Sequence, residues 1–502
     1  MFKIILIFYV LLPCSLLSQD KPNVIIIYTD DIGYGDLSCY GAKKVITKQT
    51  DNLAKEGLRF TQAHSPAATC TPSRYAVLTG EYSWRRKGTG VAPGDAPMIV
   101  SPEKYTLADM FKSGGYATGV IGKWHLGLGA KGQQDWNGLM TPGLRDLGFD
   151  YSYIMAATGD RVPCVLMEND RVEGLDPSDP IEISYTQPFA GLPTGKNNPE
   201  LLKVHPSHGH DQAIINGISR IGYMRGGNKA LWVDEDIADS ITVKAVKFIE
   251  KNHTKPFFLL FATNDIHVPR APHPRFAGQT SMGPRGDAIV QMDWCVGQIL
   301  ETLERLSLKN NTIIIFTSDN GPVVDDGYRD DSVEKLGDHK PAGNLRGGKY
   351  SKFEAGTRVP FIISYPNKIK KGVSNALVSQ IDMMHTLAYI IKVSLPDESA
   401  PDSFNSWDTW AGENKKGREY IIEATNSASV SIRTTDWKYI ETGSNYRYDT
   451  YTNIELGNDS IPQLFHLKKD ISEKTNLAFK NSKKLAEMQA LLKTIKSSSK
   501  TR

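Results

Sequence analysis

Cysteine is scarce in this sequence. Five cysteines occur among 502 residues, and no two are spaced as Cys-x-x-Cys, which speaks against a zinc knuckle or a thioredoxin-like motif. A strong net charge is also missing, because Lys and Arg exceed Asp and Glu by only three. This balance gives no sign of a nucleic-acid partner or of an anionic membrane. Internal repeats and low-complexity arrays are absent as well.

Long apolar runs are missing after the N-terminus, so we predict no membrane span. The exception is IILIFYVLLPCSLL, which follows Lys3 and is shorter than the roughly 18 residues that a span needs. A basic residue, an apolar run and a small residue at Ser18 are typical of a secretory signal peptide. We therefore predict a signal peptide at residues 1–18 and a secreted or periplasmic protein. Cleavage removes Cys14 and leaves four cysteines: Cys39, Cys70, Cys164 and Cys295.

Four short runs are apolar throughout rather than alternating, which indicates strands buried on both faces. They lie at residues 23–31, 256–265, 312–321 and 359–366. Helical patterns at 236–252 and 287–306 fall between them. Strands alternating with helices predict an α/β fold, a sheet sandwiched by helices.

Two regions depart from this rhythm. Residues 127–230 are irregular and rich in Gly, Pro and Asn, so we expect long insertions over the sheet, where specificity often resides. After residue 396, the stretches 419–425, 428–442 and 463–470 resemble strands of a small antiparallel unit. We predict a catalytic domain at 19–396 and a smaller C-terminal domain at 397–502.

Acidic and amide side chains follow two of the predicted strands. Asp30-Asp31 ends the first run and Asp319-Asn320 ends the third. In sheets of this kind, ligands gather beyond the carboxyl ends of the strands. Hard oxygen ligands select Ca²⁺ or Mg²⁺ over zinc or copper. Taken singly, each pair is better explained as a strand-end turn, where Asp and Asn are common.

Cationic and imidazole groups occur in four other motifs. Lys123 and His125 lie two apart in GKWHLG, so an extended segment would point both to one side. Each group alone is commonly a solvated surface charge or a hydrogen-bonded histidine. Together they would neutralise a tetrahedral oxyanion and transfer protons. The full set is Arg74, Lys123, His125, His267, Arg346 and Lys349, with Glu354 beside the last two.

Cys70 opens the stretch CTPSRYAVLTG. Pro72 favours a helix start there, and Arg74 would share a helix face with Cys70. A helix N-terminus attracts anions and lowers a thiol pKa. A cysteine-dependent phosphatase is excluded, because its loop needs Arg six residues after Cys and Ala76 stands there. A papain-like protease would not need the acidic pairs or the lysines. A disulfide at Cys70 stays open.

Taken together, these motifs resemble the type I, formylglycine-dependent sulfatases. TDDIGYGDLSCYG, CTPSR, GKWHLG, IHVP, SDNGP and RGGKYSKFEAGTRVP match family blocks in the family's order. LFHLKKDISEKTNLA resembles a C-terminal block. Ala355 stands where the family more often has Gly, a small change. The resemblance implies an alkaline-phosphatase-like fold, with a large mixed sheet between helices and a smaller antiparallel domain.

The resemblance also implies roles for these residues. Cys70 would be oxidised to formylglycine by a formylglycine-generating or sulfatase-maturating enzyme. One Ca²⁺ would be held by Asp30, Asp31, Asp319, Asn320 and the modified residue 70. A hydroxyl of the hydrated aldehyde would attack sulfur, and His267, helped by Lys349, would protonate the departing alcohol. His125 would then take the second hydroxyl's proton. Three cations would neutralise the sulfuryl oxygens: Arg74, Lys123 and Lys349.

The substrate is expected to be a sulfated carbohydrate. The stretches 135–137 and 154–172 resemble the branch of galactosamine and galactose sulfatases. His208, His210 and Arg270 are candidate sugar or second-sulfate contacts, or else loop histidines and a surface arginine. Two alternatives stay open. One is a phosphodiesterase or phosphonate hydrolase of the same superfamily, which the presence of two metals would indicate. The other is a glycan-binding protein without catalysis.

Overall fold

A computed structural model describes residues 21–425, 429–444 and 446–502. The predicted signal peptide lies outside the described residues. The described chain forms a central mixed sheet of ten strands. In sheet order these are β16 (Gly372–Ser379), β2 (Leu58–His64), β15 (Phe361–Ser364), β13 (Thr312–Ser318), β1 (Asn23–Thr29), β12 (Phe257–Ala262), β3 (Ala117–Lys123), β4 (Tyr151–Met155), β5 (Leu166–Glu168) and β6 (Arg171–Val172).

The four predicted apolar strands correspond to β1, β12, β13 and β15. β1 pairs in parallel with both β12 and β13, and every residue of β1 and β13 is buried. β15 runs antiparallel to β13, which makes the sheet mixed. The predicted α/β fold with a large mixed sheet is confirmed.

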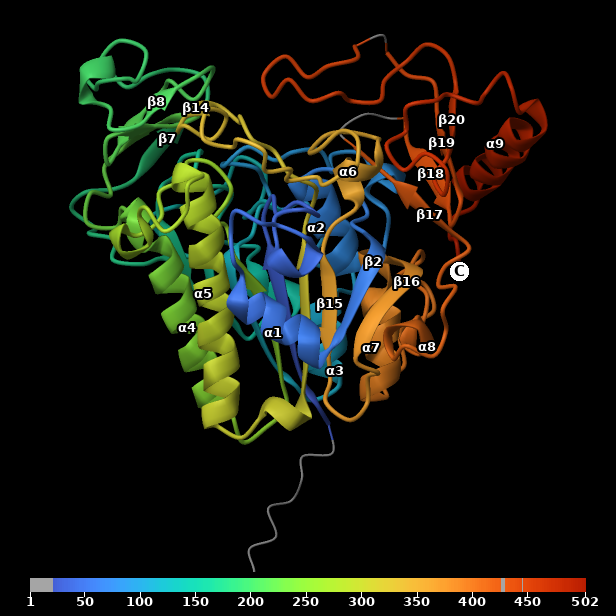
Figure 1. Cartoon of the computed structure of the whole chain (residues 1–502). Helices are drawn as coiled ribbons and strands as arrows, with labels where there is room; N and C mark the ends of the chain where they lie inside the picture. The colour runs from blue at the N-terminus through green and yellow to red at the C-terminus, as the bar shows by residue number, and fades with distance from the viewer. Residues whose placement is uncertain (1–20, 426–428, 445) are drawn as a thin grey trace, which may run out of the picture.

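Helices cover both faces of this sheet (Figure 1). One layer holds α1 (Lys48–Glu56), α4 (Ile237–Asn252) and α5 (Gly283–Arg305), and α5 packs against the other two. The other layer holds α2 (Cys70–Thr79), α3 (Leu107–Ser113) and α7 (Met383–Ile391). The helical patterns predicted at 236–252 and 287–306 match α4 and α5. A single turn, α6 (Glu354–Thr357), precedes β15, and α8 (Trp407–Trp410) contacts α7.

A four-stranded antiparallel sheet follows, as predicted for the C-terminal part. It consists of β17 (Tyr420–Glu423), β18 (Ser431–Thr434), β19 (Trp437–Ile440) and β20 (Gln463–His466), with α9 (Ser482–Ser497) packed on β19. The domain boundary at 396/397 stays a prediction. The small sheet touches the large unit at a backbone bridge between Ala67 and Ala424.

Buried charges also join the two sheets. Glu354, fully buried in α6, accepts from Arg433 of β18 at 3.0 Å and from Lys438 of β19 at 3.3 Å. Lys438 also pairs with Glu423 of β17 at 2.8 Å. We call these residues, with His64 at the end of β2, the inter-sheet charge cluster.

The region 127–230 is only partly irregular. The expectation of loops alone is wrong for β4, β5 and β6, which extend the main sheet at one edge. These strands are too short to leave a recognisable pattern in the sequence. The rest contains short strand pairs, drawn above the carboxyl ends of the central strands in Figure 1. They are β7 (Glu182–Ser184), β8 (His205–Pro206), β9 (Ile214–Ile215), β10 (Ile218–Ser219) and β11 (Tyr223–Arg225), and β8 pairs with the later β14 (Tyr328–Arg329).

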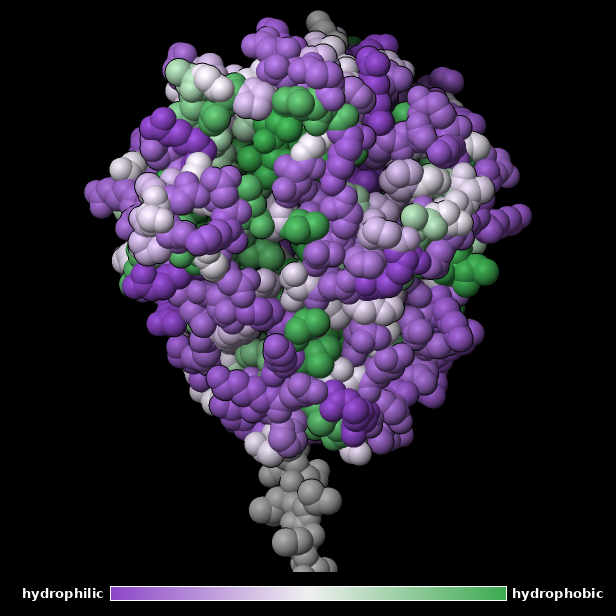
Figure 2. Space-filling model, turned by 90° about the vertical axis from the view of Figure 1, so that its left-hand side faces the viewer, coloured by the Kyte–Doolittle hydropathy of each residue, from purple (hydrophilic) through white to green (hydrophobic). Residues whose placement is uncertain are grey.

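The outer surface is largely polar. Figure 2 views the molecule from the side of α4 and α5 and shows a mostly hydrophilic face with smaller hydrophobic areas. Among the described residues, no helix has both the length and the apolar character needed to cross a bilayer.

Candidate active site

The carboxyl ends of β1 and β13 bring the predicted acids together. Thr29 and Ser318 are paired in register, so the residues that follow them emerge side by side. The amide of Asn320 donates to Asp31 Oδ1 at 2.7 Å, and the backbone N–H of Asp31 donates to Asp319 Oδ1 at 3.4 Å. All four side chains, including that of Asp30, are at most 1% exposed.

Each of the three acids has a cationic partner. Lys123 Nζ lies 2.5 Å from Asp30 Oδ2, and Lys349 Nζ lies 2.9 Å from Asp31 Oδ2. The guanidinium of Arg74 donates twice to Asp319 Oδ2, at 2.8 and 3.0 Å. Since these cations come from β3, α2 and the loop before α6, the fold gathers residues that are far apart in the chain.

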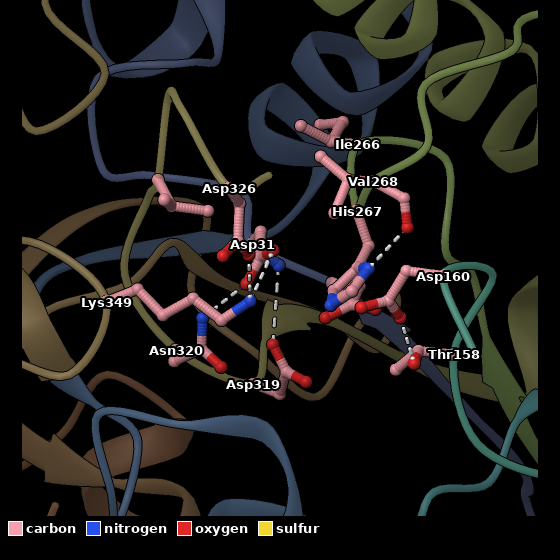
Figure 3. A network of polar contacts seen from close by, with 12 residues as sticks. Asp31, Thr158, Asp160, Ile266, His267, Val268, Asp319, Asn320, Asp326 and Lys349 are labelled. Carbon is pink, nitrogen blue, oxygen red and sulfur yellow. Dashed lines mark hydrogen bonds and ion pairs between the residues drawn. The ribbon is translucent and has the colours of Figure 1, made fainter. Parts of the chain in front are cut away.

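Lys349 occupies the space between two carboxylates. Its ammonium also contacts Asp326 Oδ2 at 3.0 Å, and Figure 3 shows it reaching toward Asp31 and Asp326. Burial alone would lower the pKa of Lys349, but the two carboxylates outweigh burial and raise it well above its ordinary value. Lys349 therefore stays charged. No pattern in the sequence pointed to Asp326.

The acids fit a hard cation. Within the described structure, Asp30 Oδ1 and Asn320 Oδ1 are buried oxygens without a hydrogen-bond partner. Buried polar atoms normally have one. Ligand atoms of Asp30, Asp31 and His267 also lie within 4.8 Å of one another. Burial, followed by the charge of Asp319, raises the pKa of Asp30 to about 6. A bound cation would stabilise the ionised carboxylate and lower this pKa. Oxygen donors of this kind suit Ca²⁺ or Mg²⁺.

Cys70 is the first residue of α2, as the position of Pro72 predicted. It is 2% exposed, and all four described cysteines have free thiols, which gives no support to a disulfide. The expectation of a lowered thiol pKa is wrong. Burial raises the pKa of Cys70, and the nearby Lys123 and Lys349 do not offset it. The unmodified thiol is thus poorly suited to act as a nucleophile.

The two predicted proton-transfer histidines are buried near these cations. His267 Nδ1 donates to the carbonyl of Val268 at 2.8 Å, which leaves Nε2 available. Burial, then Lys123 and Lys349, lower the pKa of His267 well below its ordinary value. His125 Nε2 lies 2.9 Å from the Ala92 carbonyl oxygen. Its backbone is left-handed (φ 58°), so the extended segment predicted at 123–125 is wrong and a turn delivers His125 instead.

A cavity of about 380 Å³ opens above Cys70, His267 and Lys349. Pockets of this size suit small molecules. One wall comes from the irregular insertion, where Asp160 contacts both Arg161 and His210. Arg161 donates to Asp160 at 2.8 Å, and His210 Nε2 lies 3.0 Å from Asp160 Oδ2. The predicted His208 and His210 both line this cavity.

Some residues of the wall escaped the sequence analysis. Asp160 and Arg161 lie in the stretch 154–172 but were not singled out, because their pairing needs the insertion to fold. Asp449, Tyr451 and Thr452 come from the C-terminal part of the chain. Their only sequence signal is an aromatic-rich loop between two strands.

Arg270 does not belong to the cavity lining. It is 3% exposed, and its guanidinium donates to Asp330 at 2.8 Å and to Ser332 at 2.7 Å. It also donates to two backbone carbonyls. This placement favours a structural role over the predicted substrate contact.

Comparisons with known proteins agree with this geometry. The sulfatase family model matches residues 22–392. An N-acetylgalactosamine-6-O-sulfatase from Bacteroides thetaiotaomicron is 52% identical over 479 residues, which covers 95% of this chain and 94% of that protein. Human arylsulfatase A is 29% identical over 481 residues, covering 91% and 83% of the two chains.

Solved structures point the same way. One from work on glycosaminoglycan metabolism by Bacteroides thetaiotaomicron superimposes with a TM-score of 0.94 at 52% identity, covering 95% of this chain and all of that one. A sulfatase from Pseudoalteromonas gives a TM-score of 0.69 at 25% identity, covering 96% and 92%. The family match spans most of the chain and contains the acids, the cations and Cys70, so this chain belongs to the sulfatase family and is a sulfuric ester hydrolase.

Proposed function

We propose that this sulfatase removes the 6-O-sulfate of N-acetylgalactosamine residues in a polysaccharide or oligosaccharide. One observation carries the proposal: the relative of that name is 52% identical and aligns with 95% of the chain. The sequence alone left galactose and N-acetylgalactosamine open. The assignment of the chain to the sulfatases also weighs against the phosphodiesterase alternative.

The chain's cations would bind and stabilise the sulfuryl group. Arg74, Lys123 and Lys349 are all buried, so their charges act in a medium of low dielectric. Fixed charges of this kind, directed at oxygens that gain charge in the transition state, are a large source of rate enhancement. The neighbouring carboxylates hold the three cations in place before the substrate arrives.

The proposed reaction also needs a bound metal ion and a modified residue 70. We expect Asp30, Asp31, Asp319 and Asn320 to hold Ca²⁺, which would polarise a sulfate oxygen. Formylglycine made from Cys70 by a maturating enzyme would supply the hydroxyl nucleophile that the buried thiol cannot.

His267 would donate a proton to the sugar oxygen as the bond between that oxygen and sulfur breaks. Its Nδ1 contact with Val268 fixes the ring and directs Nε2 away from that carbonyl. Burial and two lysines disfavour the imidazolium, and the negative charge of a bound sulfate would counter those lysines. His125 remains the candidate for the second proton transfer.

The cavity wall would recognise the sugar. Arg161 offers donors on this wall, whereas both ring nitrogens of His210 are engaged, by Asp160 and by the His208 carbonyl. We propose that the Arg161 guanidinium contacts a sugar hydroxyl and that the His210 ring shapes the wall beside it. Their buried pairing makes the wall rigid, and rigid polar groups discriminate between sugars that differ in one hydroxyl. We also propose export to the periplasm or the medium, where such glycans are found.

The test is a panel of defined sulfated saccharides. Protein whose position 70 is shown by mass spectrometry to be formylglycine is incubated with the 6-O- and 4-O-sulfates of N-acetylgalactosamine, the 6-O-sulfates of galactose and N-acetylglucosamine, and a phosphodiester. Released sulfate is quantified and the product's regiochemistry is read by NMR. We expect the N-acetylgalactosamine 6-O-sulfate to give the highest kcat/KM and Cys70→Ala to give none.

Other results would redirect the assignment. A higher kcat/KM on another sugar or on the 4-O-sulfate would refute the proposed substrate. Preference for the phosphodiester would refute the activity. Saccharide binding without turnover by the formylglycine form would favour the glycan-binding alternative.

A further inference from the structure

The cavity has a second wall, built by the C-terminal part of the chain. Asp449, Tyr451 and Thr452 line it, beside the wall formed by the insertion. In Figure 1 the loop that carries them extends over the large sheet from the side of β18 to β20. We call residues 446–456 the C-terminal rim.

Tyr451 presents an open aromatic face at this rim. It is 63% exposed, although it lines a cavity. Its ring stacks on His208, with centroids 5.1 Å apart and planes inclined by 21°. One face of the ring is therefore covered and the other is not. An aromatic side chain held open beside an active site is typical of a ligand contact, because Tyr supplies apolar area at a low cost in conformational entropy.

The ring is held in position from within the rim. Asp449 Oδ1 accepts from the backbone N–H groups of Tyr451 and Thr452, at 3.0 and 2.9 Å, and from the Thr452 hydroxyl at 3.0 Å. These three bonds use Asp449 Oδ1 and fix the turn that presents the exposed ring of Tyr451 to the cavity.

The base of the rim is fastened to the segment that carries Lys349. Glu455 forms a bidentate ion pair with Arg346, at 2.6 and 2.7 Å. Ser351 donates to the Glu455 carbonyl at 2.6 Å, and the Lys352 backbone N–H donates to the Leu456 carbonyl at 3.0 Å. The position of Tyr451 is thus fixed relative to the group that would bind sulfate.

We propose that Tyr451, backed by His208, forms a subsite for the pyranose that is linked to the sulfated sugar. The inference rests on the proposed function and deepens it. The sulfated sugar would lie deep in the cavity, with its sulfate near Lys349 and its own hydroxyls near Arg161. The next pyranose would stack its C–H face on the open side of Tyr451. A monosaccharide would not reach this ring.

The experiment compares a monosaccharide with a disaccharide in binding. The probes are N-acetylgalactosamine 6-O-sulfate and a disaccharide that carries it at the non-reducing end. Binding to Cys70→Ala protein is measured by calorimetry, so turnover does not interfere. We expect Tyr451→Ala to weaken disaccharide binding about tenfold and to leave monosaccharide binding within about twofold. Tyr451→Phe, which keeps the ring, should bind both probes like the parent.

Tyr446→Ala is the matched control, because Tyr446 is an exposed tyrosine of the same rim and lies outside the cavity lining. It should change neither affinity. Equal losses for both probes in Tyr451→Ala, or none, would overturn the second-sugar subsite while the proposed function stands. If the formylglycine form neither binds nor desulfates either probe, the proposed function fails and the subsite fails with it.

Discussion

Lys349 shows how the active site sets the state of a single residue. It is 1% exposed and lies between Asp31 and Asp326, which keep it charged despite burial. Its charge is therefore present before any substrate binds. Removing it should cost transition-state stabilisation, because only two of the three cations proposed for the sulfuryl oxygens, Lys123 and Arg74, would remain.

We expect Lys349→Ala to lower kcat/KM for desulfation about 10²–10³-fold, by analogy with the loss of one oxyanion-hole donor. The measurement is the initial rate of sulfate release at several substrate concentrations. Lys340→Ala, at an exposed lysine outside the cavity, is the control and should retain parental rates. A loss below tenfold in Lys349→Ala would show that this ammonium does not stabilise the transition state.

At the residue scale, the sequence predicted groups that follow strands and missed groups that depend on loops. Asp30 and Asp319 could be brought together in advance, because neighbouring parallel strands end at one edge of the sheet. Asp160 and Tyr451 could not, because no periodic pattern fixes where an irregular insertion or a late loop comes to rest. Arg270 was predicted as a candidate sugar or second-sulfate contact, but the direction of its side chain cannot be read from the sequence.

Between elements, the inter-sheet charge cluster is the main polar contact. Glu354 of α6 receives Arg433 and Lys438 from two strands of the small sheet, and all three are at most 1% exposed. Charges buried this deeply are costly unless each is paired. The cluster therefore makes the position of one sheet relative to the other depend on paired buried charges, and Glu354 is the carboxylate that Arg433 and Lys438 share.

Neutralising that carboxylate should loosen the contact. We expect Glu354→Gln to destabilise the protein by about 3–5 kcal/mol, because it leaves two buried cations short of a partner. Thermal unfolding followed by circular dichroism measures the effect. Glu413→Gln, at an exposed surface glutamate, should shift the midpoint little. An unchanged midpoint in Glu354→Gln would mean that water or other carboxylates satisfy Arg433 and Lys438.

The cluster also predicts a dependence of stability on pH. His64 at the end of β2 faces Glu423 at 3.0 Å and Glu354 at 4.0 Å, with Arg433 nearby. Burial lowers its pKa to about 4, against about 6.5 in an unfolded chain. The folded state thus favours neutral His64. Its contribution, about 3 kcal/mol, is complete above pH 6.5 and is lost as the pH falls toward 4.

Unfolding midpoints measured from pH 8 to pH 4 test this, with His64→Gln as the reference because it cannot titrate. We expect the parent to lose stability relative to the variant between pH 6.5 and pH 4. Parallel curves would show that His64 titrates alike in the folded and unfolded chains.

Element by element, burial decided what the sequence could predict. β1, β12 and β13 lie in the middle of the sheet and consist almost wholly of buried apolar residues, so they stood out. β2 (LRFTQAH) and β3 (ATGVIGK) contain polar residues and glycines, and neither was predicted. Their strand conformation depends on pairing with neighbours that were themselves found from sequence.

On the scale of the whole molecule, the proposed cation would join distant parts of the chain. Its ligands follow β1 and β13, and Lys349 contacts one of them. Ca²⁺ that binds only the folded protein stabilises it by mass action, by about 2.7 kcal/mol at a hundred times its Kd.

We therefore expect a calcium chelator to lower both the unfolding midpoint and the rate of sulfate release, and added Ca²⁺ to restore both. Asp31→Asn should respond less to either treatment in the unfolding assay, which needs no turnover. Identical midpoints with and without Ca²⁺ in the parent protein would contradict a calcium site. Recovery with Mg²⁺ alone would reassign the metal.

The overall architecture was predictable because α/β alternation and the late antiparallel strands leave clear signatures. The enclosure of the active site was not. The C-terminal rim reaches a cavity that Cys70, His267 and Lys349 also line, and only the folded chain brings these residues together. Under the proposed function, recognition of the sugar would depend on the insertion and the C-terminal rim as well as on the predicted catalytic residues.

The contact between Ala68 and Ala424 bears on the order in which the chain is made. The backbone N–H of Ala68, two residues before Cys70, donates to the Ala424 carbonyl at 2.8 Å. Ribosomes release Ala424 long after Cys70, so the segment that would be read by a maturating enzyme stays without this cover for most of translation. Packing of β17 beside this segment would then come late in translation, so an enzyme that reads residues 70–74 would meet them before the contact forms.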